Sequence, residues 1–122
     1  MQVLVIDDDE AVRQTIALLL EDVGIEVVQA ADGKEGLRAF QRARPDLIVT
    51  DIIMPEKEGI QTIAEIRASG SKTGIIAISG GGAGSADLYL NMAEELGADA
   101  TLAKPFRPSD LLSLVLRLLQ AR

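Results

Sequence analysis

Several side chains that could do chemistry come directly after short apolar runs of this chain. The pattern is clearest at Asp51, because the run before it, residues 47–50, has no polar alternation and is typical of a strand covered on both faces. Other such positions follow similar runs and are Asp7, Asp8, Ser79 and Lys104. Because ligands of parallel sheets bind at the carboxyl ends of the strands, we expect these side chains to meet at one edge of a sheet.

Three carboxylates at one place would repel one another, and each would resist ionising. A divalent hard cation removes that conflict, and an all-oxygen site suits Mg²⁺ or Mn²⁺. Each residue also has a plain structural explanation when it is taken alone. Asp51 could begin a turn, and the acidic run 7–10 could stabilise a helix N-terminus. The combination at several strand ends is what indicates a site.

In this order, these residues resemble the receiver domain of bacterial two-component response regulators. The resemblance runs from the first predicted strand to the last predicted helix, and the residues that carry it are Asp7, Asp8, Asp51, Met54, Pro55, Gly59, Ser79, Lys104, Pro105 and Phe106. It implies a phospho-accepting module similar to stand-alone chemotaxis regulators. In that reading, Asp51 takes a phosphoryl group from a histidine kinase or a histidine phosphotransfer protein, and the phosphorylated form signals to a downstream protein by contact.

The resemblance also implies a metal site and its ligands. Asp8 and Asp51 would ligate Mg²⁺, or Mn²⁺ in its place, while Asp7 would hold the ion through water. The backbone carbonyl of Ile53 would supply a further ligand. Protein catalysis of phosphoryl transfer consists mostly of positioning and charge neutralisation, which is what such a cation would provide.

Two further positions follow from the resemblance, and one departs from it. A cis Lys104–Pro105 peptide bond would aim the ammonium at a phosphoryl oxygen on Asp51, and the Ser79 hydroxyl would donate to the same group. Thr101 stands where the family usually carries a rotating Tyr or Phe. We therefore expect the signal to travel mainly through the glycine-rich loop 80–84 and the helix start that follows it.

Apolar runs and helical patterns alternate along the chain, which predicts an α/β class with helices on both faces of the sheet. The resemblance, together with the need to cluster the acids, favours a doubly wound five-stranded parallel sheet of flavodoxin-like order 2-1-3-4-5. The expected strands are 3–6, 26–30, 47–50, 74–79 and 100–103. The expected helices are about 10–22, 34–43, 58–69, 86–96 and 108–119.

The last helix has an unusually wide apolar arc. Leu114 and Leu116 stand at its two edges, so we expect them to be partly exposed. A surface of this kind is suited to contact with a partner or with a second copy of the chain.

Composition narrows the function classes. A chain of 122 residues is expected to form one receiver domain, 1–122, without an output domain, as a monomer or weak dimer. The formal net charge of −7 argues against direct nucleic-acid binding. No apolar run approaches the ~20 residues of a membrane span, and no signal sequence is visible, so we expect a cytoplasmic location. The chain has no Cys and no His, which excludes disulfides and phosphohistidine chemistry on the chain itself.

Three other readings are weaker. An aspartate-nucleophile phosphatase of the haloacid dehalogenase type needs an acid two residues after the nucleophile, where this chain has Ile53. A nucleotide or flavin binder would use the loop 80–84, which matches neither the dinucleotide fingerprint nor a P-loop. A degenerate receiver would not need the full acidic set with Ser79 and Lys104. We therefore expect no enzyme acting on an external substrate, only catalysis of the module's own phosphorylation and dephosphorylation.

Overall fold

The computed structural model describes residues 1–52, 58–80 and 86–121. The strands are β1 (Gln2–Ile6), β2 (Glu26–Ala30), β3 (Leu47–Asp51), β4 (Gly74–Ser79) and β5 (Ala100–Ala103). The helices are α1 (Glu10–Glu21), α2 (Gly33–Ala43), α3 (Glu58–Ala68), α4 (Ala86–Leu96) and α5 (Pro108–Gln120). Every expected element is present, with boundaries shifted by a residue or two at most.

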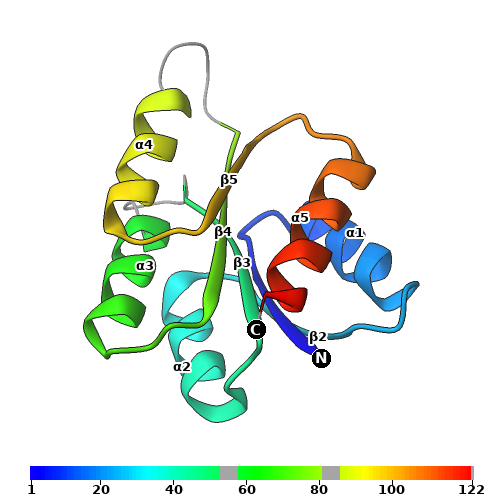
Figure 1. The fold of residues 1–122 in the computed structure, drawn as a ribbon, viewed down its shortest axis with the longest axis horizontal. Helices are drawn as coiled ribbons and strands as arrows, with labels where there is room; N and C mark the ends of the chain where they lie inside the picture. The colour runs from blue at the N-terminus through cyan, green and yellow to red at the C-terminus, as the bar shows by residue number, and fades with distance from the viewer. Residues whose placement is uncertain (53–57, 81–85, 122) are drawn as a thin grey trace.

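All five strands pair in parallel in the order β2-β1-β3-β4-β5. Figure 1 shows α1 and α5 on one side of the sheet and α2, α3 and α4 on the other. The expected doubly wound α/β class and its strand order are therefore confirmed. From β1 the chain first adds a strand on one side, β2, and then crosses over to add β3 on the other side. The carboxyl ends of β1 and β3 therefore lie side by side at the switch point, where open α/β sheets bind ligands.

The two faces of the sheet carry separate apolar cores, because successive side chains of a strand point to opposite faces. The core toward α2, α3 and α4 contains the strand residues Leu4, Ile6, Ala30, Ile48, Ile75 and Ala77. The core toward α1 and α5 contains the strand residues Val3, Val5, Leu47, Val49, Ile76 and Ile78. All five residues of β3 are buried, which confirms a strand covered on both faces.

Local signals in the sequence set the helix boundaries. The side chain of Asp9 accepts from the backbone N–H groups of Ala11 and Val12 and so caps α1. Asp32 caps α2 in the same way, accepting from the backbone of Glu35. Gly24 and Gly70 follow α1 and α3 with positive φ values of 84° and 87°, a conformation that favours glycine at helix ends.

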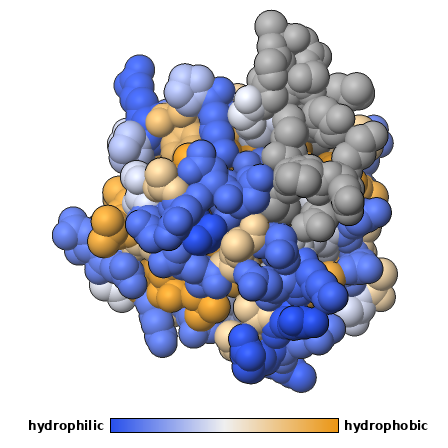
Figure 2. Space-filling model, turned by 180° about the vertical axis from the view of Figure 1, so that it is seen from behind, coloured by the Kyte–Doolittle hydropathy of each residue, from blue (hydrophilic) through white to orange (hydrophobic). Residues whose placement is uncertain are grey.

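The surface of α5 is less covered than a core helix would be. Leu111, Val115 and Leu119 are buried, while Leu116 is 41% exposed and Leu114 is partly buried. The expected partial exposure at the edges of the apolar arc is therefore confirmed, although contact with a partner there stays a prediction. Seen from behind in Figure 2, hydrophobic areas lie among hydrophilic ones on the side of α1 and α5, at the left of that view.

Within the described residues, no helix has the length and apolar character needed to cross a membrane.

Candidate functional site

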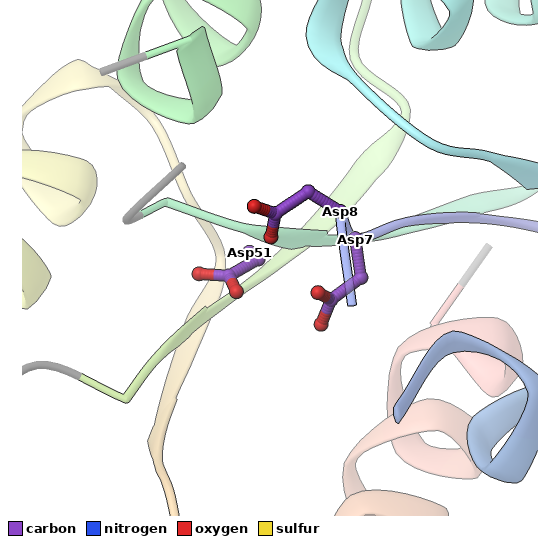
Figure 3. Close-up of side chains that lie close together, drawn as sticks. All are labelled: Asp7, Asp8 and Asp51. Atoms are coloured by element: carbon purple, nitrogen blue, oxygen red, sulfur yellow. The ribbon is translucent and has the colours of Figure 1, made fainter. Parts of the chain in front are cut away.

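The sheet brings three carboxylates together at its carboxyl edge. Ile6 pairs with Thr50, so the residues after them, Asp7 and Asp51, leave neighbouring strands at the same level. Asp7, Asp8 and Asp51 each offer a carboxylate oxygen, and these oxygens all lie within 4.8 Å of one another. Figure 3 shows the three side chains gathered at the ends of β1 and β3. A cluster of oxygen ligands this close fits a hard divalent cation.

The three carboxylates differ in exposure. Asp7 and Asp51 are buried, with 1% and 5% of their surface exposed, whereas Asp8 is exposed. Two acids are therefore held inside the protein, and the third lies on the solvent side of the cluster. A charge in such a place needs a counter-ion, because burial disfavours the ionised form.

Lys104 supplies one counter-ion. Its Nζ lies 3.0 Å from Oδ2 of Asp51 and 3.2 Å from Oδ2 of Asp7. The ammonium comes from the residue after β5, and the Lys104–Pro105 peptide bond is cis. Gly80 leaves room for this side chain, because a Cβ at that position would approach Cδ of Lys104 to 2.9 Å.

Burial and the neighbouring charges of the cluster shift two pKa values. Burial raises the pKa of Asp7 above its ordinary 3.8, and the nearby Asp51 charge adds to this, while the backbone N–H of Asp9 and the Lys104 ammonium only partly offset it. Burial alone would lower the pKa of Lys104, but the hydrogen bonds and charges of Asp51 and Asp7 outweigh it and raise that pKa above 10.5. Lys104 therefore stays charged. One ammonium faces a cluster of three carboxylates, which leaves a place for a metal cation as a further counter-ion.

Ser79 lies beside this cluster, whereas Thr101 does not belong to it. Ser79 is fully buried at the end of β4, and its backbone oxygen accepts from the backbone N–H of Lys104 at 2.8 Å. The hydroxyl of Thr101 donates to Oε1 of Glu94 on α4 at 3.3 Å, in an exposed position. The carbonyl of Ile53 and residues 81–84 of the glycine-rich loop lie outside the described residues.

Gly59 has a structural role that its place in the motif does not reveal. A Cβ there would collide with the backbone oxygen of Asp51 and with Cα of Ile52. Only glycine therefore lets the start of α3 approach the end of β3 so closely.

Arg13 is a contributor that the sequence pattern does not indicate. Its Nη1 donates to the backbone oxygen of Asp7 at 2.8 Å, and its Nε donates to Oε1 of Gln29 at 3.2 Å. The only signal available in the sequence is an arginine in the second turn of a helix that starts next to an acidic run, and such a residue is commonly solvated.

A model of the response regulator receiver domain matches residues 3–116 of this chain. The chain belongs to this family. This receiver domain is 38% identical over 119 residues to a probable transcriptional regulator, ycf27, of Cyanophora paradoxa, which covers 98% of this chain and 48% of that protein. It is 34% identical over 119 residues to the protein PilG of Pseudomonas aeruginosa, which covers 94% of this chain and 84% of PilG.

Among solved structures, the receiver domain of the Francisella response regulator 1452 superposes with a TM-score of 0.88 at 32% identity, covering 98% of this chain and 97% of that one. The chain spans about half the length of the first curated relatives it matches. Membership makes it a receiver domain of two-component signalling, a family that is generally non-enzymatic and typically uses Mg²⁺ at an acidic aspartate pocket.

The receiver domain also has an apolar groove that leads to the acidic cluster. The groove has a volume of about 910 Å³ and lies between α1 and the segment that follows β5. Its wall on the α1 side includes Leu18, which is 67% exposed. Its other lining residues are Ala11, Val12, Thr15, Ile16, Leu19, Asp22, Gly80, Lys104, Pro105, Phe106 and Pro108. Because Lys104 lines the groove, a molecule seated there lies next to the charged site.

Proposed function

We propose that Asp51 is the phosphoryl acceptor of this receiver domain and that its donor is a phosphohistidine on a kinase or phosphotransfer protein. The observation that carries the proposal is the Asp51 carboxylate itself. It is buried at the end of β3, its carboxylate shares the site with those of Asp7 and Asp8, and it contacts the Lys104 ammonium at 3.0 Å. A nucleophile in this setting is already positioned, and its environment neutralises incoming negative charge.

Asp7, Asp8 and Asp51 would hold Mg²⁺, or Mn²⁺ in its place, with Asp7 acting through water and the backbone carbonyl of Ile53 as a further ligand. The donor set supports this assignment because all the ligands are oxygens and the three carboxylates approach within 4.8 Å. A divalent cation bound there neutralises the charge that builds up on the phosphoryl oxygens.

The remaining residues would act on the phosphoryl group. An oxygen of Asp51 forms the new bond to phosphorus while the donor's P–N bond breaks, and the bonding electron pair returns to the imidazole nitrogen. Lys104 then exchanges its contact with the Asp51 carboxylate for one with a phosphoryl oxygen. The buried Ser79 hydroxyl donates a charge-assisted hydrogen bond to the same group.

A helix of the phosphodonor would bind in the groove beside α1. The donor must bring its imidazole to Asp51, and the groove is continuous with that site through Lys104 and Gly80. Its lining is largely apolar and includes the exposed Leu18, which suits the apolar face of an amphipathic helix.

The phosphorylated form would signal by contact with a downstream protein, as a monomer or weak dimer in the cytoplasm. Catalysis would be limited to the domain's own phosphorylation and to hydrolysis of the acyl phosphate. A phosphatase acting on external substrates is disfavoured because Ile53 stands where that chemistry needs a general acid.

The test is incubation with acetyl phosphate and Mg²⁺, followed by intact-mass measurement. Wild-type protein should gain one phosphoryl group, and the Asp51→Asn variant should gain none while keeping the wild-type circular dichroism spectrum. Asp46→Asn is the matched control, because Asp46 precedes the same strand and lies at its opposite end. Labelling of the Asp51→Asn variant at the wild-type rate would refute the assignment, and turnover of phosphodonor without an adduct would indicate a phosphatase.

A further inference from the structure

Arg13 connects three elements at the edge of the acidic cluster. The residue belongs to α1, and its guanidinium reaches the backbone oxygen of Asp7 at 2.8 Å. The same guanidinium donates through Nε to the side chain of Gln29 on β2 at 3.2 Å. The hydrogen bond to Asp7 is partly buried, and one from a charged donor is stronger than one between neutral groups.

Asp7 is held at each of its other polar atoms as well. Its backbone N–H donates to the oxygen of Ala30 at 3.1 Å, and its Oδ1 accepts from the backbone N–H of Asp9 at 2.9 Å. Its Oδ2 accepts from Lys104. The backbone oxygen is therefore the remaining polar atom of Asp7, and without a bond to it the peptide after β1 could rotate. Arg13 donates that hydrogen bond.

The orientation of Asp8 depends on this contact. The backbone oxygen of Asp7 lies in the same rigid peptide plane as the nitrogen of Asp8. A hydrogen bond to that oxygen therefore fixes the direction in which the backbone enters Asp8. Figure 3 shows the carboxylates of Asp7 and Asp8 leaving the end of β1 in different directions, with that of Asp8 toward Asp51. Asp8 is exposed, so packing contributes less to its orientation than it does for the two buried acids.

We propose that Arg13 is a positioning residue for the metal-binding carboxylates: by holding the Asp7–Asp8 peptide plane, it keeps the Asp8 carboxylate directed at Asp51. The inference rests on the proposed function, because it takes Asp7, Asp8 and Asp51 as the ligands of Mg²⁺. Arg13 acts through Asp7, because its guanidinium binds the backbone oxygen of Asp7 and the side chain of Gln29.

Charge and position act in opposite directions here, which makes the proposal testable. A guanidinium beside the cluster repels a divalent cation, so removing its charge alone would strengthen Mg²⁺ binding. Loss of the contact with Asp7 would instead weaken binding, because the carboxylates would no longer be pre-arranged. Removing a group that orients a metal ligand commonly costs about tenfold or more in metal affinity.

The experiment measures Mg²⁺ dissociation constants by calorimetric titration of the full chain, with amide shifts of Asp7, Asp8 and Asp9 recorded in parallel. Arg13→Ala should bind Mg²⁺ about tenfold more weakly than wild type. Arg13→Lys keeps the charge but has one nitrogen in place of three, so its Mg²⁺ affinity should fall between those of wild type and Arg13→Ala. Arg38→Ala removes an exposed arginine from α2 and is the matched control for net charge. At saturating Mg²⁺, the Arg38→Ala control should be phosphorylated by acetyl phosphate at the wild-type rate, since Arg38 is an exposed residue of α2.

Each outcome has a distinct meaning. If Arg13→Ala binds Mg²⁺ as tightly as wild type or more tightly, Arg13 is only a nearby charge and the proposal fails while the metal site stands. If wild-type protein shows no saturable Mg²⁺ binding, the proposed metal site fails and this role of Arg13 fails with it. If Arg13→Ala does not fold, Arg13→Lys decides, because affinity equal to wild type would overturn the proposal and weaker binding would support it.

Discussion

The Nζ atom of Lys104 contacts the carboxylates of both Asp51 and Asp7, at 3.0 Å and 3.2 Å. These partners lie 53 and 97 residues away in the chain. One ammonium therefore ties the end of β5 to the ends of β3 and β1. In this arrangement a single cation balances part of the charge of three clustered acids, and the excess negative charge is what a metal ion would neutralise.

Replacing Lys104 should destabilise the metal-free protein. Without the ammonium, Asp7 and Asp51 are left as buried carboxylates without that partner, so the Lys104→Met variant should lose about 1–3 kcal/mol of unfolding free energy at pH 7. This loss of unfolding free energy is smaller than the loss expected for a fully buried ion pair, because 21% of the Lys104 side chain is exposed. Mg²⁺ should stabilise this variant more than wild type, because the cation meets less positive charge. Urea unfolding with and without Mg²⁺ measures both effects, and the exposed Lys72→Met change is the control.

Asp7 should make the metal-free protein less stable as the pH rises. Its pKa in the folded state is raised above 3.8 by burial, so between 3.8 and that raised value the folded protein holds a proton that the unfolded chain has released. Stability is therefore lost as the pH rises through this window. The Asp7→Asn variant, which cannot ionise there, should be more stable than wild type at pH 7 without Mg²⁺, and the difference should shrink as the pH falls toward 3.8. Thermal unfolding at several pH values would contradict this if the variant were less stable throughout.

The groove beside α1 should affect transfer from a protein donor but not from a small molecule. Leu18→Gln removes an exposed apolar side chain while keeping a good helix former. Phosphorylation by the kinase that labels the wild type should slow by about tenfold to a hundredfold, because burying a leucine side chain contributes about 1.5–3 kcal/mol to an interface. Labelling by acetyl phosphate should be unchanged. Val23→Gln alters another exposed apolar residue, which follows α1 but does not line the groove, and serves as the control. Equal kinase rates for wild type and Leu18→Gln would exclude this docking mode.

Thr101 should carry little of the phosphorylation signal. Its hydroxyl bonds to Glu94 at 3.3 Å in an exposed position, and such contacts contribute little in water. With a beryllofluoride mimic bound, backbone amide shifts should therefore change more at residues 80–88 than at Thr101 and Leu102. The Thr101→Val variant removes the donor without changing the shape of the side chain, and it should leave the shifts at 80–88 as they are in wild type. Larger changes at β5 than at 80–88 would locate the switch elsewhere.

Much of the fold could be predicted from local patterns, because each depends on neighbouring residues. The unbroken apolar run before Asp51 predicts a doubly covered strand, and the residue spacing that follows it predicts a helix. Asp9 caps α1 because a side-chain oxygen reaches only the N–H groups next to it. The parallel strand order came from the family resemblance and the clustering of acids, since periodicity carries no information on which strands pair.

What the tertiary structure decided is how atoms distant in sequence meet. The sequence places acids, a hydroxyl and a lysine at strand ends, but only the register between β1 and β3 brings the carboxylates of Asp7 and Asp51 within ligand distance of each other. The bond from Arg13 to the backbone of Asp7 could not be read from the chain, because a backbone oxygen gives no signal in a pattern of side chains. The groove was equally hidden, since it exists only where α1 packs beside the segment after β5, and no local pattern records the space between two elements.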